Sequence, residues 1–472
     1  MHRVGCRHDE PAGVGEFRPV SVPFGRLGPR RAAFATALVA LLLTGAGAPV
    51  AATPTPGAGF GDSGSGAATT VLGDGGDARA RALVRASDGS LVVAGYARDA
   101  GRYVMTVSRY TSAGALDPTF GTAGVALIPL GSGTAAQANA ALVQPDGKII
   151  VGGAASDEGQ QKFAVVRLNP NGSLDTTFGT NGVVLTAVGG ENSTFDSVVN
   201  ALLLQPDGSV VAVGTAAITV QIGVSESMQS VLALARYTSD GSLDNAFGKA
   251  GLVVATVGNG SYATGNAALL QSDGKIVAAG SAFQSIGTDV AVLRFNTDGS
   301  ADTAFGTSGV VLSQIGSTGG TAVAYALAPG PSGEVVAAGY AQDHGHYKFM
   351  AARYTANGSA DTTFGKNGSV LTDVGDAGSA SANALVTESD GSFVGVGTAS
   401  DGGHRKVALA RWTSSGALDS NFAAGGISLT SHSDSASATA GLAQSDGSIL
   451  AAGSTFEHTR FDMLLIRVAA GS

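Results

Sequence analysis

The sequence predicts an all-β fold: a seven-bladed β-propeller with four-stranded blades, its ring closed by an N-terminal strand that completes the C-terminal blade. Three observations predict it. A repeat of about 58 residues recurs through the chain, each copy contains four β-rich stretches, and one copy is divided between the two ends. Fixed periods of this kind build propellers or solenoids, and four short strands per repeat is typical of a propeller blade.

The first repeated element is a tight turn followed by an apolar strand. The interval from the turn Asp to the Gly after the strand is the same in each copy, as in Asp88 to Gly95, and Ser332 replaces Asp in the fifth. Asp-Gly supplies the positive φ that tight hairpins require, so the element predicts a β-hairpin turn. The seven copies begin at Ser87, Pro145, Pro206, Ser272, Pro331, Ser389 and Ser445.

The second element is a strand ending in Arg, a turn, and the pattern LDxxFGxxxG. Because residues that recur in every blade do not single out one binding site, we interpret them as scaffold. The Phe is expected to fill the space between blades, and the glycines to allow close backbone approach. We also expect the recurring Arg and Asp to pair: Arg109/Asp117, Arg167/Asp175, Arg236/Asp244, Arg294/Asp302, Arg353/Asp361 and Arg411/Asp419.

The seventh repeat is split. It stops after Arg467 without its LDxxFG, whereas an isolated FGDSG lies at Phe60 to Gly64. We therefore expect the strand from Gly64 to Val71 to become the outer strand of the C-terminal blade and to close the ring. An open β-solenoid is the alternative, but it needs capping repeats and gains nothing from a divided one.

The repeat resembles that of the delta-60 family, bacterial β-propeller proteins with about sixty residues per repeat. The residues that carry the likeness are PDGKIIVGG from Pro145 and NGSLDTTFGTNG from Asn171, and the resemblance covers residues 58 to 468. It implies the propeller fold. It implies little about activity, because a fold hosts many functions.

The N-terminal region predicts export. Arg26, Arg30 and Arg31 precede an apolar run from Ala32 to Leu43, and small residues follow up to Ala52. This is the pattern of a secretory signal, with a run too short for a membrane-spanning helix. We expect a cleaved signal region at 1–52, a linker at 53–57 and the propeller at 58–472, with a retained N-terminal anchor as the alternative. The predicted location is extracellular or at the cell envelope.

The composition limits the classes of partner that we expect the mature chain to bind. Residues from 53 onward carry 21 Lys/Arg and 33 Asp/Glu, a net charge of −12, which disfavours nucleic acid and anionic membrane surfaces. Cys6 is the only cysteine and lies within the predicted signal region, so no disulfide is expected. We expect a monomer without membrane insertion after cleavage.

Strand direction assigns the loops to two faces. In a four-stranded meander the first and third turns lie on one face, here called the uniform face because its Asp-Gly turns hardly vary. The second turn and the link to the next blade lie on the other, the variable face. The third blade has eight extra residues there, between Thr215 and Ser230.

The variable face also gathers most of the polar residues that do not recur, and binding residues commonly lie on loops held by a rigid scaffold. No metal or cofactor is expected, since no D-x-[DN]-x-[DN]-G loop is present and His344-Gly-His346 alone is too little for zinc. The candidate ligand-binding residues are Glu191, Asp196, His344, His346, Asp373, Asp376, His432 and Asp434.

Three functions are compatible with this pattern. The leading hypothesis is a secreted binding or scaffolding propeller that presents its variable face to a protein or polysaccharide. The second is an extracellular glycan hydrolase or lyase with acidic residues at the channel mouth, although the G-x-S-x-G, H-E-x-x-H and P-loop motifs are absent. The third is a structural surface protein without a saturable ligand.

Overall fold

The structure, a computed structural model, describes residues 59–61, 65–189, 196–222, 225–376 and 378–469. These residues fall within one unit of the chain, Phe34–Ser472, and their regular structure consists of 28 β-strands. The predicted signal region and linker lie outside the described residues. No helix in the described part of the chain is long and apolar enough to cross a membrane.

The strands form seven antiparallel sheets of four, each a blade in which sequential strands pair. The first three blades are β2 (Ala78–Arg85), β3 (Leu91–Asp99), β4 (Arg102–Tyr110), β5 (Val125–Ile128); β6 (Ala136–Val143), β7 (Ile149–Asp157), β8 (Gln160–Leu168), β9 (Val183–Thr186); and β10 (Ser197–Leu204), β11 (Val210–Ile222), β12 (Ser225–Tyr237), β13 (Leu252–Ala255).

The next three blades follow the same order. They are β14 (Ala263–Leu270), β15 (Ile276–Phe283), β16 (Thr288–Phe295), β17 (Val310–Ser313); β18 (Ala322–Pro329), β19 (Val335–Asp343), β20 (His346–Tyr354), β21 (Ser369–Thr372); and β22 (Ala380–Thr387), β23 (Phe393–Asp401), β24 (His404–Trp412), β25 (Ile427–Thr430).

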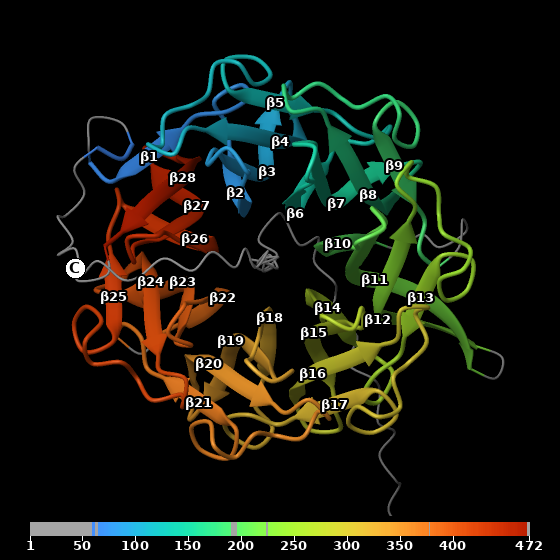
Figure 1. The fold of residues 1–472 in the computed structure, drawn as a ribbon, viewed down its shortest axis with the longest axis vertical. Coiled ribbons are helices and arrows are strands. Elements are labelled where there is room, and N and C mark those ends of the chain that lie inside the picture. Colours follow the sequence, from blue (N-terminus) through green and yellow to red (C-terminus); the bar gives the residue numbers. More distant parts are fainter. Residues whose placement is uncertain (1–58, 62–64, 190–195, 223–224, 377, 470–472) are drawn as a thin grey trace, which may run out of the picture. The chain divides into compact units, whose positions relative to one another are not determined.

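The seventh blade closes the ring as predicted. It combines β26 (Ser435–Ala443), β27 (Ile449–Glu457) and β28 (Arg460–Val468) with β1 (Ala67–Thr70) from the other end of the described chain. β1 pairs antiparallel with β28, and Figure 1 shows this blue strand beside the red ones. The seven-bladed propeller predicted from the repeat is therefore confirmed.

The first strand of each blade is the inner one (Figure 1). Each inner strand contacts the inner strand of the next blade, and β26 contacts β2, so the seven form an unbroken ring around a central axis. The faces of neighbouring blades bury Ala, Val and Leu against one another, for example Ala82 and Val92 of the first blade against Ala141 and Val151 of the second. Burial on both faces explains strands that are apolar throughout.

The recurring residues clamp each blade to the next. All six predicted Arg–Asp pairs form, with the most buried, Arg167 and Asp175, at 2.7 Å. Arg167 also donates to the Ser239 carbonyl of the third blade and lies 4.6 Å from the ring centre of Phe178. A Cβ on Gly241, at φ +89°, would meet that ring at 3.1 Å. The motif is thus scaffold, and its turn glycine is required by the adjoining Phe.

The clamp also sets the ionisation of its carboxylates. Burial alone would raise the pKa of Asp175, but hydrogen bonds from Thr177, Lys148 and Arg167 outweigh it and hold that pKa well below its usual range. Asp175 therefore stays ionised at acidic pH values where a free aspartate would already take up a proton. Its charge contributes stability that is lost only in acid.

The eight extra residues of the third blade lengthen one hairpin. β11 and β12 have 13 residues each, whereas β3 and β4 have nine, and the pairing continues to Ile222↔Ser225. The insertion is therefore an extended two-stranded ribbon on the variable face. It begins beyond the Ile218↔Gln229 pair, the position where the other blades turn.

Candidate functional site

The inner strands carry a ring of hydrogen bonds around the axis. All seven inner strands have a β-bulge at the same place. The bulged residue of one blade donates to the backbone carbonyl just before the bulge of the next. The donors and acceptors are Asn139 to Val199, Asn200 to Gly265, Asn266 to Ala324, Asn383 to Ala438 and Thr439 to Ala80.

Two blades depart from this ring. The bulged residue is Arg81 in the first blade and Tyr325 in the fifth, and each is 8% exposed. Four other blades carry Asn at this position and the seventh carries Thr439, so Arg81 and Tyr325 are the two large side chains among the seven. These departures single out the first and fifth blades.

The same two blades share a further pattern. GYARDAGRY from Gly95 and GYAQDHGHY from Gly339 match at the second and third strands of their blades. In each, two tyrosines stack edge to face: Tyr96 with Tyr103 at 5.5 Å, and Tyr340 with Tyr347 at 5.3 Å between ring centres. The residues that correspond to Tyr96 in the other blades are small: Ala154, Thr215, Ser281, Thr398 and Ser454.

The fifth-blade cluster consists of Tyr325, Tyr340 and Tyr347, with Tyr262 nearby. Tyr325 and Tyr340 lie 5.7 Å apart at their ring centres, and burial raises the pKa of both. Tyr262 adds to the rise, which places its phenol in the same neighbourhood. Tyr262 is 47% exposed and Tyr347 38% exposed. The cluster therefore offers neutral phenols and accessible ring surface on the variable face.

The first-blade cluster adds cations to the rings. The Arg79 guanidinium lies 3.7 Å from the ring centre of Phe461, and that of Arg81 lies 5.5 Å from that of Tyr96. The Tyr103 hydroxyl donates to Asp77 at 3.4 Å, and burial raises the pKa of Tyr103. Arginine stacks well on aromatic faces while keeping its donors in plane for an anion.

The predicted candidates mostly close turns and pair with neighbouring loops. Asp376 accepts from the Gly402 backbone N–H at 2.8 Å, and Asp373 pairs with Lys348 at 3.1 Å. The Nε2 of His432 is 3.1 Å from Thr69 Oγ1, and the Asp434 carbonyl is 2.9 Å from the His404 ring. These contacts account for the conformations of the loops.

The remaining candidates differ in setting. His344 lies in the β19–β20 turn, pairs with Asp343 at 3.0 Å and is 88% exposed, and the exposed His346 directly precedes Tyr347. Asp196 is exposed just before β10, and Glu191 lies outside the described residues. The two histidines therefore lie on the hairpin that carries the fifth-blade cluster. A ligand-binding role for the eight residues stays a prediction.

Within the described ranges no three His, Cys, Asp or Glu side chains come together in a way that could hold a metal ion. The described candidates are spread over several blades, with Asp373 and Asp376 in one loop and His432 and Asp434 in another. They therefore do not form such a group of three within the described residues.

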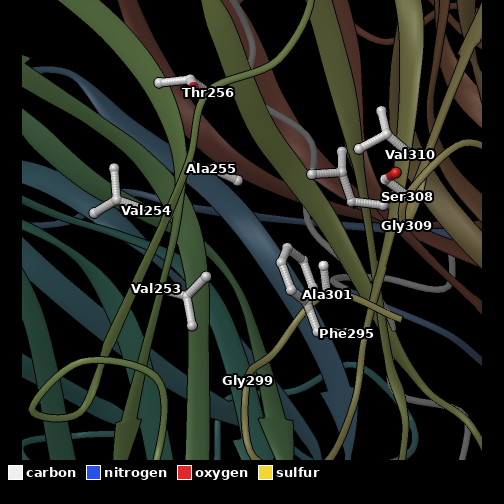
Figure 2. Close-up of a pocket in the computed structure, with 11 residues that line it drawn as sticks. Val253, Val254, Ala255, Thr256, Phe295, Gly299, Ala301, Ser308, Gly309 and Val310 are labelled. Carbon is white, nitrogen blue, oxygen red and sulfur yellow. The ribbon is translucent and has the colours of Figure 1, made fainter. Parts of the chain in front are cut away.

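A separate hollow of about 380 Å³ lies between the outer strands of the third and fourth blades (Figure 2). Val253 and Ala255 line one side, and Phe295, Ala301 and Val310 the other. Ala301 occupies a position where four other repeats carry the larger Leu of LDxxFG and the fifth carries Ala360, so a small side chain leaves space here. Its polar side chains are Thr256 and Ser308, and none of the clustered tyrosines lines it.

Sequence reasoning missed both clusters although the sequence contains a pattern for them. The inner-strand motif NAL recurs at Asn200 and Asn383, with Arg81 and Tyr325 in its first position elsewhere. GYAxDxGxY occurs in two repeats. The earlier expectations considered non-recurring residues in loops, whereas these departures lie within strands.

Comparison with known families supports the repeat. The model of a domain of unknown function (DUF5122), described as a β-propeller, matches residues 86–120, 144–178, 205–247, 271–305 and 330–364. Five of the seven repeats therefore resemble a known β-propeller repeat, in agreement with the fold. The narrower assignment to the delta-60 family stays a prediction. No curated protein matches the chain.

Several solved structures are similar at low identity. The polysaccharide lyase Uly1 has 11% identity and a TM-score of 0.45, covering 83% of this chain and 90% of that one. Sqt1 of Chaetomium thermophilum has 12% and 0.39, covering 84% and 97%. The sialidase of Trypanosoma rangeli has 10% and 0.37, covering 85% and 59%. At this level of similarity none of them indicates the function of this chain.

Proposed function

We propose that this chain is a non-catalytic binding propeller whose variable face holds an extended polysaccharide. The observation that carries the proposal is the paired tyrosine arrangement, built into the first and fifth blades and into no other described blade. The scaffold pairs of Arg and Asp recur in six blades, whereas this arrangement recurs in two. Two equivalent sites on one rigid ring suit a chain-like ligand that contacts both.

Saccharides suit these sites chemically. The C–H faces of a sugar pack on aromatic rings, and its hydroxyls form hydrogen bonds with phenols. One tyrosine can therefore make both the apolar and the polar contact. Tyr347 and Tyr262 expose ring surface, while burial raises the pKa of Tyr340 further above its usual value. A protein partner would need about 800 Å² of continuous complementary surface on this chain, whereas two separate aromatic sites need far less.

Binding to polysaccharides tests the proposal. The chain from residue 53 is run through gels containing xylan, galactan, arabinan, dextran or polygalacturonate, and retardation is measured against polymer concentration. We expect saturable retardation by at least one polymer, weakened about tenfold by Tyr347→Ala or Tyr103→Ala, because the loss of an aromatic contact worth about 1.4 kcal/mol changes the affinity tenfold.

Leu418→Ala is the matched control. Leu418 is as exposed as Tyr347, at 37%, but lies in a turn of the uniform face. Its substitution should leave retardation unchanged. The proposal would be contradicted if no polymer bound saturably. It would also be contradicted if Leu418→Ala weakened binding as much as the tyrosine substitutions do.

The proposed function includes export, because we expect the polysaccharide ligand to lie outside the cell. Cleavage after Ala52 is the predicted step. N-terminal sequencing of protein recovered from the medium checks it: Thr53 should be the first residue. Recovery only in the cell fraction with the N-terminus intact would contradict export.

A further inference from the structure

The two arginines of β2 are exceptional among the inner strands. At the bulge position the seven blades carry Arg81, Asn139, Asn200, Asn266, Tyr325, Asn383 and Thr439, and two residues earlier they carry Arg79, Gln137, Val198, Thr264, Val323, Ser381 and Ser437. Arg79 and Arg81 are the only charged residues in these two rows. The repeat therefore does not require a cation at either place, and the first blade places two beside the central axis.

The surroundings of Arg79 leave it able to take an anion. Within the described residues it forms no ion pair, and its Nε, which is shielded from solvent, donates no hydrogen bond. Its face rests on Phe461. The nearby carboxylates have other partners: Asp462 pairs with Arg460 at 3.0 Å, and Asp77 accepts from Tyr103. A shielded Nε–H without a hydrogen-bond acceptor costs free energy, and an anion bound to this guanidinium would recover that cost.

We infer that Arg79 and Arg81 form a subsite for an anionic group of the ligand, a carboxylate or a sulfate ester. The inference rests on the proposed function and names the class of polysaccharide as acidic. The planar guanidinium matches a carboxylate or sulfate through parallel N–H donors, while Phe461 and Tyr96 hold the two guanidinium planes by stacking. Tyr96 and Tyr103 then contact the sugar that bears the charge.

The test uses substitutions that the fold already accepts. Arg79→Gln with Arg81→Asn gives the first blade the residues that the second blade carries at the same positions, Gln137 and Asn139. Arg81→Asn also introduces the amide that four other blades carry at this position, so this double variant should remain folded. Arg85→Gln is the control: it removes a charge from the same strand at the opposite end, where Arg85 contacts Gln444.

Two measurements distinguish the outcomes. The first compares the affinity for polygalacturonate and dextran sulfate with that for dextran; we expect wild type to prefer the charged polymers at least tenfold, and the double variant to lose this preference. The second measures the thermal stability with millimolar glucuronate or sulfate, expecting a rise in Tm for wild type and Arg85→Gln but not for the double variant.

Each result decides one point. Equal affinity of wild type for charged and neutral polymers, or an unchanged preference in the double variant, overturns the anionic subsite while leaving polysaccharide binding in place. Stabilisation by glucuronate and sulfate without binding to any polymer supports the subsite and overturns the proposed function. No effect of any anion, free or polymeric, overturns the subsite.

Discussion

Ring closure can be tested through one side chain. Phe60 is the N-terminal counterpart of the Phe that each repeat inserts between blades, and it is 2% exposed against Gly114 of the first blade. Its neighbour Gly61 donates to the Ala113 carbonyl at 2.8 Å, as Gly248 donates to that of Asp298 at 2.8 Å. Phe60→Ala should therefore destabilise the propeller as an internal substitution does.

The expected magnitude follows from burial. Replacing a fully buried Phe by Ala costs about 3–5 kcal/mol. Phe247, which is fully buried beneath Arg236 at 4.6 Å, should lie in the upper half of that range, because it also loses a cation–π contact of about 1 kcal/mol. Phe60 should lie near the lower end, about 3 kcal/mol.

Urea unfolding followed by the fluorescence of Trp412 measures both variants. Trp412 is the only tryptophan and is fully buried in the sixth blade, so its emission reports the cooperative unfolding of the ring. Phe60→Ala and Phe247→Ala should both lower the midpoint strongly. If Phe60→Ala stayed within about 0.5 kcal/mol of wild type while Phe247→Ala lost several, the N-terminal segment would not be closing the ring.

Three further predictions concern stability and are measured by the same unfolding assay. Thr459 adopts φ +101° in a turn where the fifth blade has Gly345. Thr459→Gly should therefore stabilise the propeller by about 1 kcal/mol, and Gly345→Thr should destabilise it by more. A loss of stability in Thr459→Gly would refute the idea that Thr459 is strained. Asp175→Asn should cost about 3–5 kcal/mol at pH 7 because it leaves Arg167 unpaired. Since the folded-state pKa of Asp175 is depressed, the difference in unfolding free energy between wild type and Asp175→Asn should shrink as the pH falls below about 4. A difference that stays constant down to pH 2 would contradict the argument. Replacing residues 219–228 by an Asn-Gly turn should change stability by less than about 1 kcal/mol, because the ribbon extends beyond the blade; a larger loss would show that it supports the ring.

Much of the fold could be predicted because the repeat constrains it many times over. The interval from Arg to Asp in six copies predicted the pairs that form, and the isolated FG at Phe60 predicted which strand completes the last blade. Strand direction alone placed the extra residues of the third blade on the variable face. Each of these inferences depends on chain connectivity and local turn geometry, which the sequence contains.

The site was harder to predict because it depends on which strand positions meet near the axis. Tyr325 and Arg81 occupy a bulge, and a bulge interrupts the two-residue alternation that would assign a side chain to a face. The partner of Arg79 is Phe461, nearly four hundred residues away in the chain. Loop residues such as Asp376 were visible as exceptions, but their hydrogen-bond partners depend on how adjacent turns pack.

The central claim is that the variable face binds a polysaccharide through the first and fifth blades. Hydrogen–deuterium exchange of the chain with and without saturating polygalacturonate tests it most directly. Protection should appear at residues 96–104 and 340–347, the hairpins that carry the paired tyrosines, with the Asp-Gly turns of the uniform face unchanged. Protection confined to those Asp-Gly turns would contradict the claim.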